Sequence, residues 1–203
     1  MDALLALHRQ SRRTVVGLMS GTSLDGVDAA LVHLDDSGPD LMMESEAFVH
    51  VPYPGPLQEL IHKTTSSSSS IRDVTRLDAR LAEAYADAVG NVLEEAGTDR
   101  EALDLVGAHG QTVCHLPEPT DCAGEAVRAT LQLGNSSTLA TRLGVPVVGH
   151  FRAADLALGG QGAPLVPYFD HAVFTAPDET RGLLNLGGIA NLTVLPAGGA
   201  PDD

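Results

Sequence analysis

The first hundred positions show two kinds of apolar spacing. Strands are predicted over 14–20, 27–34 and 41–51, where β-branched and apolar runs are separated by turns rich in Gly, Ser and Asp. These three strands would form an antiparallel meander. Apolar residues then recur every three or four positions over 56–64 and 71–96, which predicts two helices, the second packed on the sheet.

Beyond Gly97 the pattern changes to strands alternating with short helices. The expected elements, in order, are strands over 103–110 and 129–135, a helix through 136–143 and a strand over 145–151. A stretch rich in Gly and Pro at 155–170 precedes a further strand and turn over 182–195. This alternation predicts an α/β protein with a mixed sheet flanked by helices.

Composition excludes several classes of protein. The 203 residues are 43% hydrophobic, enough for a sizeable core. Acidic residues outnumber basic ones 27 to 12, giving a net charge of −15, which argues against a nucleic-acid partner. We expect no membrane association, because no apolar run reaches the roughly 18 residues of a membrane span. Two cysteines make a disulfide framework improbable and favour a reducing cytoplasm.

The first candidate site is MSGTSLDGVD at 19–28. Gly21 and Gly26 allow backbone amides to point inward, and Thr22 and Ser23 add hydroxyl donors, so the turn could cradle a phosphate. Asp25 and Asp28 are suited to a hard cation such as Mg²⁺. The alternative is a structural hairpin turn, which the same residues also explain. The turn is not a Walker A loop, since no Gly-Lys-Ser/Thr follows it.

The second candidate is GAHGQTVCH at 107–115. His109 and Gln111 lie where open α/β sheets bind ligands, and such a cluster suits a hydroxyl-rich substrate. A capped loop with one hydrogen-bonded histidine is the alternative. A zinc site is disfavoured because the spacing matches no familiar pattern; its ligands would be His109, Cys114, His115 and Cys122.

Two glycine-rich segments follow. In FRAADLALGGQGAPL, Asp155 comes three residues after Arg152 and just before glycines that allow close backbone approach, so it could act as a general base. The alternative is an Asp that caps a turn. In LNLGGIANLTVL, Gly187 and Gly188 interrupt a strand, which indicates a bulge or a close ligand contact.

The order of these segments resembles the 1,6-anhydro-N-acetylmuramic acid kinase family. The resemblance covers residues 15–195 and is carried by GLMSGTSLDGVDAALV, GAHGQTVCHLP, the 131–170 segment containing GHFRAADLALGGQGAPL, and LNLGGIANLT. It implies an actin-like, sugar-kinase-like ATPase fold with a ribonuclease H-like first lobe. ATP and the amino sugar would bind between two lobes, and the full-length protein would be a cytoplasmic homodimer that recycles peptidoglycan fragments.

The resemblance also implies roles for individual residues. The ATP phosphate loop would comprise Gly21, Thr22, Ser23, Leu24, Asp25, Gly26, Val27 and Asp28. Asp155 would activate water at the anomeric carbon while ATP phosphorylates O6, giving N-acetylmuramic acid 6-phosphate. His109, Gln111 and Arg152 would position the sugar or its lactyl carboxylate, for which the planar guanidinium is well suited. ATP and Mg²⁺ are the expected cofactors.

The resemblance covers only the first half of a chain of that family. It implies an extension over 1–13, a first lobe over 14–195 and the start of a second lobe over 196–203, with the remaining lobe absent. The expectation is that the 203 residues alone turn over little or no substrate. A fragment or a truncated gene is favoured over one half of a split kinase, and over a non-catalytic interaction module that has kept the first-lobe fold.

Overall fold

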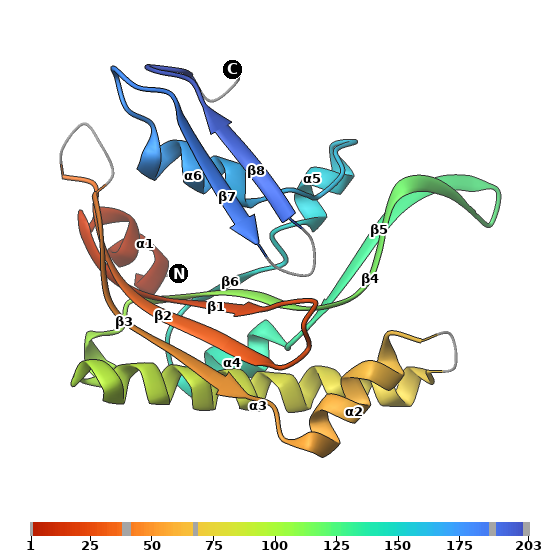
Figure 1. The fold of residues 1–203 in the computed structure, drawn as a ribbon. Helices are drawn as coiled ribbons and strands as arrows, with labels where there is room; N and C mark the ends of the chain where they lie inside the picture. The colour runs from red at the N-terminus through yellow and green to blue at the C-terminus, as the bar shows by residue number, and fades with distance from the viewer. Residues whose placement is uncertain (1, 38–41, 67–68, 187–189, 201–203) are drawn as a thin grey trace.

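The structure is a computed structural model, and it describes residues 2–37, 42–66, 69–186 and 190–200. Its main sheet is mixed and has the order β3-β2-β1-β4-β5, with β6 paired to β4 (Figure 1). The strands are β1 (Arg12–Ser20), β2 (Gly26–Asp35), β3 (Met42–Pro52), β4 (Leu105–Cys122), β5 (Glu125–Leu133) and β6 (Val147–Gly149). β1, β2 and β3 form the expected antiparallel meander, and β4 runs parallel to both β1 and β6.

Helices α2 (Gly55–Thr64), α3 (Ile71–Ala96) and α4 (Ser136–Leu143) lie on one side of this sheet (Figure 1). All three were predicted from apolar spacing and are confirmed. Ser70 fixes the start of α3 through a capping box with Asp73, and Gly97 ends the helix in the left-handed conformation. A short 3₁₀ turn, η1 (Arg100–Ala102), then leads into β4.

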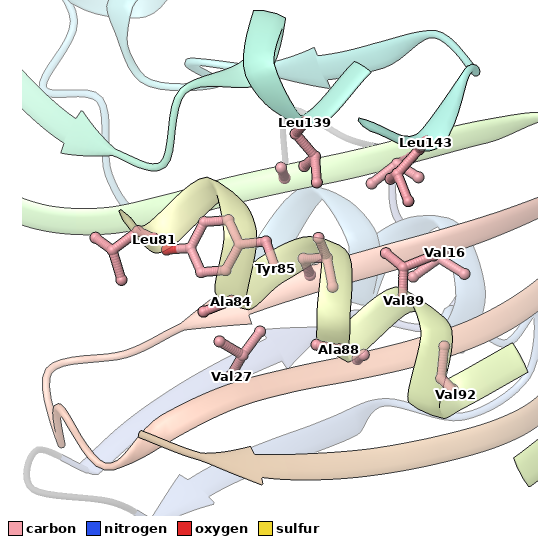
Figure 2. Close-up of a cluster of buried hydrophobic side chains, with 14 of the residues drawn as sticks. Val16, Val27, Leu81, Ala84, Tyr85, Ala88, Val89, Val92, Leu139 and Leu143 are labelled. Carbon is pink, nitrogen blue, oxygen red and sulfur yellow. The ribbon is translucent and has the colours of Figure 1, made fainter. Parts of the chain in front are cut away.

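The core lies between α3 and the sheet. Figure 2 shows side chains of α3, including Leu81 and Val89, between Val16 and Val27 of the sheet and Leu139 of α4. All five side chains are 0–1% exposed. Burial of each such side chain stabilises the fold by about 1.5–3 kcal/mol, so α3 holds the strands that carry the polar motifs in a fixed position.

The remaining elements lie on the opposite side of the sheet (Figure 1). They are α1 (Asp2–Arg9), α5 (Ala153–Ala157), α6 (Val166–Phe174), β7 (Arg181–Leu186) and β8 (Ala190–Leu195). The segment predicted as one strand and a turn over 182–195 contains two strands, β7 and β8, which form a separate two-stranded sheet. Gly187 and Gly188, predicted to form its bulge, fall outside the described residues.

The structure goes beyond the expected secondary structure in three places. The strand predicted over 103–110 continues to Cys122, because β5 pairs with it as far as Cys122↔Glu125 in a hairpin that projects from the sheet (Figure 1). A helix, α1, occupies most of the 1–13 segment, for which none was expected. Helix α6 forms over Val166–Phe174, where no helix was predicted, and its proline is compatible with it because it lies in the first turn, where no intrahelical N–H is needed.

Candidate active site

The bend between β1 and β2 is a tightly folded backbone turn. The amide of Leu24 donates to the carbonyl of Gly21 at 3.3 Å, and Leu24 has φ 57°, in the left-handed region. A side chain at Gly26 would collide with the carbonyl oxygen of Val51 and with the His50 ring. Only glycine therefore allows this approach of β2 to β3, and the bend depends on it.

Residues at the start of α2 hold the bend from outside. The amide of Tyr53 donates to the carbonyl of Asp25 at 2.8 Å, and Gln58 Nε2 donates to the carbonyl of Leu24 at 3.1 Å. Neither residue was predicted to belong to the site. Tyr53 lies in a proline-bounded turn and Gln58 on a helix, so nothing local in the sequence indicated contact with a bend about thirty positions earlier.

A buried polar network supports the bend from below. Gln111 is 1% exposed and Ser20 is 2% exposed. Ser20 Oγ donates to Gln111 Oε1 at 2.5 Å, and Gln111 Nε2 donates to the carbonyl of Gly21 at 3.2 Å. Because the serine proton is used in this way, the Tyr53 hydroxyl donates to Ser20 Oγ, at 2.7 Å. Burial raises the pKa of Tyr53, so this donor keeps its proton.

His109 lies two residues before Gln111 and holds Arg152. Its Nδ1 lies 2.7 Å from the carbonyl of Gly110, and its Nε2 accepts from Arg152 Nε at 3.0 Å. His109 is 7% exposed, and burial is the main cause that lowers its pKa, with the charge of Arg152 acting in the same direction. The neutral ring with its proton on Nδ1 therefore fits both contacts.

Arg152 and Asp155 organise the glycine-rich loop that follows. Arg152 Nη1 donates to the carbonyl of Gly162 at 2.6 Å, and the amide of Gly162 donates to Asp155 Oδ2 at 2.6 Å. Within the described part of the chain, no hydrogen bond is made by Arg152 Nη2 or by Asp155 Oδ1. Asp155 is exposed, so the carboxylate that closes this turn also has an oxygen left for other chemistry.

Asp28 of β2 and Phe151, the residue before Arg152, line one hollow. It has a volume of about 480 Å³ and lies on the side of the sheet opposite α3. Asp28 at the end of the bend and Phe151 both line it, together with apolar residues of β1 and β3. Asp155, four residues beyond Phe151, is not part of this lining. The structure thus brings Asp28 and Phe151 to one hollow, whose lining contains no residue of 21–25 and not Arg152.

Other residues of the bend differ in what they present. Asp25 Oδ1 accepts from the Ser23 hydroxyl at 2.6 Å, and this bond is the main reason why the pKa of Asp25 is lowered. Asp28 Oδ1 lies 2.7 Å from His50 Nδ1. Val27 is 1% exposed and packs in the core, so its side chain cannot reach a ligand. Thr22 lies exposed in the bend.

The two aspartates fit an oxygen-seeking cation. Each uses Oδ1 in the contacts above, and neither Oδ2 has a hydrogen bond to another described residue. Oxygens of this kind are the ligands that Mg²⁺ prefers. The described residues contain no group of three or more His, Cys, Asp or Glu side chains placed to hold a metal. Cys114 and Cys122, considered for zinc, are both exposed free thiols on the projecting hairpin.

Comparison of the sequence with known proteins identifies one family. The family model "Anhydro-N-acetylmuramic acid kinase" matches residues 13–202. A protein of that name from Salinibacter ruber is 80% identical over the whole chain, and one from Caldanaerobacter subterraneus is 42% identical. A third, from Vibrio vulnificus, is 43% identical over 91% of the chain. All three relatives carry the name of a small-molecule kinase.

The chain belongs to the anhydro-N-acetylmuramic acid kinase family. It spans about half the length of the curated relatives that it matches, 51% of the Salinibacter ruber protein and 52% of the Caldanaerobacter subterraneus protein. Among solved structures, a CasPhi-2 complex with crRNA and DNA has a TM-score of 0.19 at 11% identity, too low to support any argument. No helix in the described residues is long and apolar enough to cross a membrane.

Proposed function

We propose that this chain supplies the ATP phosphate loop and part of the sugar site of a kinase that opens and phosphorylates 1,6-anhydro-N-acetylmuramic acid. The observation that carries the proposal is the bend at Gly21–Asp25, held by Tyr53, Gln58 and Gln111. Exposed backbone held this firmly can meet a phosphate without reorganising. The expected actin-like, two-lobe fold belongs to the same proposal.

The cofactors have defined places in this proposal. ATP would be held at Gly21–Asp28 and supplies the γ-phosphoryl group, while Asp25 and Asp28 would hold Mg²⁺ through their Oδ2 atoms. The net charge of −15 repels a polyanion overall, so local donors must outweigh it. Arg152 adds one positive charge next to Phe151, which shares a hollow with Asp28.

Asp155 is proposed as the general base. Its Oδ2 is held by the amide of Gly162, which fixes the carboxylate, and Oδ1 would accept a proton from water. As the water oxygen bonds to C1 of the sugar, the C1–O6 bond breaks, and O6 takes the γ-phosphoryl group while the bond to ADP breaks. The proton of the water ends on Asp155, and the products are N-acetylmuramic acid 6-phosphate and ADP.

Arg152, His109 and Gln111 are proposed to position the sugar in different ways. His109 and Gln111 already bind protein atoms through their side-chain nitrogens and oxygen, so they would act by fixing Arg152 and the bend. Arg152 keeps Nη2 for the lactyl carboxylate, and such charge-assisted bonds are strong. We further propose a cytoplasmic homodimer acting in peptidoglycan recycling, without a nucleic-acid or membrane partner.

The test uses this chain joined to the remainder of the Salinibacter ruber relative. With ATP, Mg²⁺ and anhydro-N-acetylmuramic acid, the joined protein should form the 6-phosphate, and Asp155→Asn should lower kcat at least about 100-fold with little change in ATP binding. Asp178→Asn, an exposed change of the same kind, should keep normal turnover. Near-normal turnover in Asp155→Asn would show that Asp155 is not the general base. If the joined protein without substitutions forms no 6-phosphate, the proposed reaction is wrong.

A further inference from the structure

The outward face of α3 carries its charges in two separate halves. Figure 1 shows the main sheet on one side of α3, and the side chains that point toward the sheet are buried. Residues that recur every three or four positions on the opposite face are exposed or partly exposed. They are Arg72, Arg76, Arg80, Glu83, Asp87, Asn91 and Glu94, with Glu95 beside the last of them. Basic residues therefore occupy the first half of this face and acidic residues the second half.

Six of these charges have no partner in the part of the chain that the structure describes. The side chains without a hydrogen bond or ion pair there are those of Arg72, Arg76, Arg80, Asp87, Glu94 and Glu95. The other charged side chains of α3 each have a neighbour, Asp73 with Lys63, Asp78 with Asn135 and Glu83 with Arg142. The unpaired charges are thus three arginines in the first half of the helix and three acids in the second.

The electrostatics of a single helix disfavour this order. A helix has partial positive charge at its N-terminus and partial negative charge at its C-terminus, so acids are favoured in the first turn and bases in the last. Arg72 lies in the first turn of α3, whereas Glu94 and Glu95 lie in the last turn, which has no basic residue. The separation of charge therefore works against the isolated helix, and a second charged body on this face would offset it.

The pattern fits a second copy of the same helix that runs in the opposite direction. Arg80 and Asp87 are equally far along the chain from the midpoint of Ile71–Ala96, and so are Arg72 and Glu95. In an antiparallel pair, Arg80 of each copy would lie opposite Asp87 of the other, and Arg72 opposite Glu95. A two-fold axis repeats each ion pair, and the helices would overlap over their whole length of about 39 Å.

Two further residues of this face suit the close approach of a second helix. Glu83 lies next to the midpoint, and Arg142 Nη2 is 2.8 Å from its Oε1, so the two copies of Glu83 would not meet as bare charges. Gly90 is exposed, and nothing lies within 4 Å of the carbon that a side chain would add there. Glycine inside a helix is destabilising relative to alanine, and no contact among the described residues requires it at this position.

We propose that two copies of this chain associate through antiparallel α3 helices, with the arginines of each copy facing the acids of the other. This inference rests on the homodimer in the proposed function and adds to it the surface by which the copies meet. Exposed ion pairs contribute little affinity, so their main effect is to fix the direction and register of the helices. The hollow lined by Asp28 and Phe151 is on the other side of the sheet, so this contact leaves it open in both copies.

Sedimentation equilibrium of the 203-residue chain tests the contact. Arg80→Glu and Asp87→Arg should each weaken the dimer at least about tenfold, because each places like charges together in both symmetry-related pairs. A chain with both substitutions should recover the dissociation constant of the parent within about threefold, since each pair is restored in reverse. Arg9→Glu, which changes the net charge as much as Arg80→Glu does but on the other side of the sheet, should leave the dimer unchanged.

Two triple variants exclude association through another surface. The acidic variant combines Arg72→Glu, Arg76→Glu and Arg80→Glu, and the basic variant combines Asp87→Arg, Glu94→Arg and Glu95→Arg. Each should be monomeric where the parent is dimeric, and an equimolar mixture should form a heterodimer; circular dichroism should show the helix content of the parent in both. A parent that stays monomeric up to about 1 mM, a dimer that Arg80→Glu leaves intact, or a mixture without heterodimer would overturn the inference.

The joined protein distinguishes this inference from the proposed function. If it forms the 6-phosphate and remains a dimer when it carries Arg80→Glu, the reaction and the homodimer stand and the α3 contact is wrong. If Arg80→Glu separates the two copies while the joined protein without substitutions forms no 6-phosphate, the contact stands and the proposed reaction fails.

Discussion

Polar side chains are hydrogen-bonded to one another beneath the bend, whereas those lining the hollow between α6 and the β7–β8 hairpin are not. Beneath the bend, the side chains of Ser20, Tyr53 and Gln111 satisfy one another and the backbone. In the hollow, the side chains of Asp170, Asn185 and Asn191 have no partners among the described residues. Paired buried groups rigidify a structure, whereas polar groups that line an open hollow can exchange hydrogen bonds with water and add little rigidity. The four predictions that follow test this difference.

The largest effect is expected where the bend has no spare room. Gly26→Ala should lower the free energy of unfolding by about 3 kcal/mol, because its methyl group would collide with backbone of β3. Gly17→Ala is the matched control in the neighbouring strand, where nothing lies within 4 Å of the added carbon, and it should change stability by less than about 0.5 kcal/mol. Urea unfolding of both variants measures the difference, and equal losses would contradict a tightly packed bend.

Removing one amide from each region compares them directly. Gln111→Leu removes the acceptor of the buried Ser20 hydroxyl proton and one of the two donors to the carbonyl of Gly21, and should cost about 2 kcal/mol. Asn185→Leu removes an exposed amide that makes no hydrogen bond among the described residues, and should cost less than about 0.5 kcal/mol. The comparison fails if urea unfolding gives Asn185→Leu the larger loss.

A single hydroxyl provides a finer version of the same comparison. Tyr53→Phe removes the donor to Ser20 and should lower the free energy of unfolding by about 1 kcal/mol. Tyr168→Phe makes the same change on α6, where the ring is 80% exposed, and should be neutral. Denaturant midpoints of the two variants give the difference, and a neutral Tyr53→Phe would mean that the network does not stabilise the bend.

The smallest effect is expected in the pH dependence of stability. The pKa of His109 is lowered in the folded state, mainly by burial, so the unfolded chain binds its proton more tightly. The resulting stabilisation is complete above about pH 6.5 and is lost as the pH falls towards the lowered folded-state value. His109→Gln should lose less stability than the parent between about pH 7 and pH 5, as urea unfolding can show. Identical slopes would mean that His109 titrates as it does in the unfolded chain.

Sequence spacing predicted the layers of the fold because they depend on local periodicity. The α3 helix lies where apolar residues recur every three or four positions, and Ser70 and Gly97 mark its ends. The length of β4 could not be predicted in this way, since pairing with β5 maintains it through polar positions. Helix α6 was not predicted because its segment contains a proline, which usually argues against a helix. This proline lies in the first helical turn, where it is tolerated.

The candidate site was predicted as a set of segments, and its connections were not. The sequence indicated Gly21–Asp28 through its glycines and hydroxyls, and Arg152 and His109 through their position. It gave no sign that Tyr53 and Gln58 hold the bend, because these contacts join distant segments.

Hydrogen exchange of the joined protein, with and without Mg²⁺ and ATP, tests the central claim that the bend at Gly21–Asp28 holds the phosphates of the nucleotide. ATP should slow exchange in peptides covering the bend, and Gly26→Ala should remove that protection while Gly17→Ala retains it. If the joined protein phosphorylates the sugar while exchange in the bend is the same with and without ATP, the phosphates are held elsewhere and the claim is wrong.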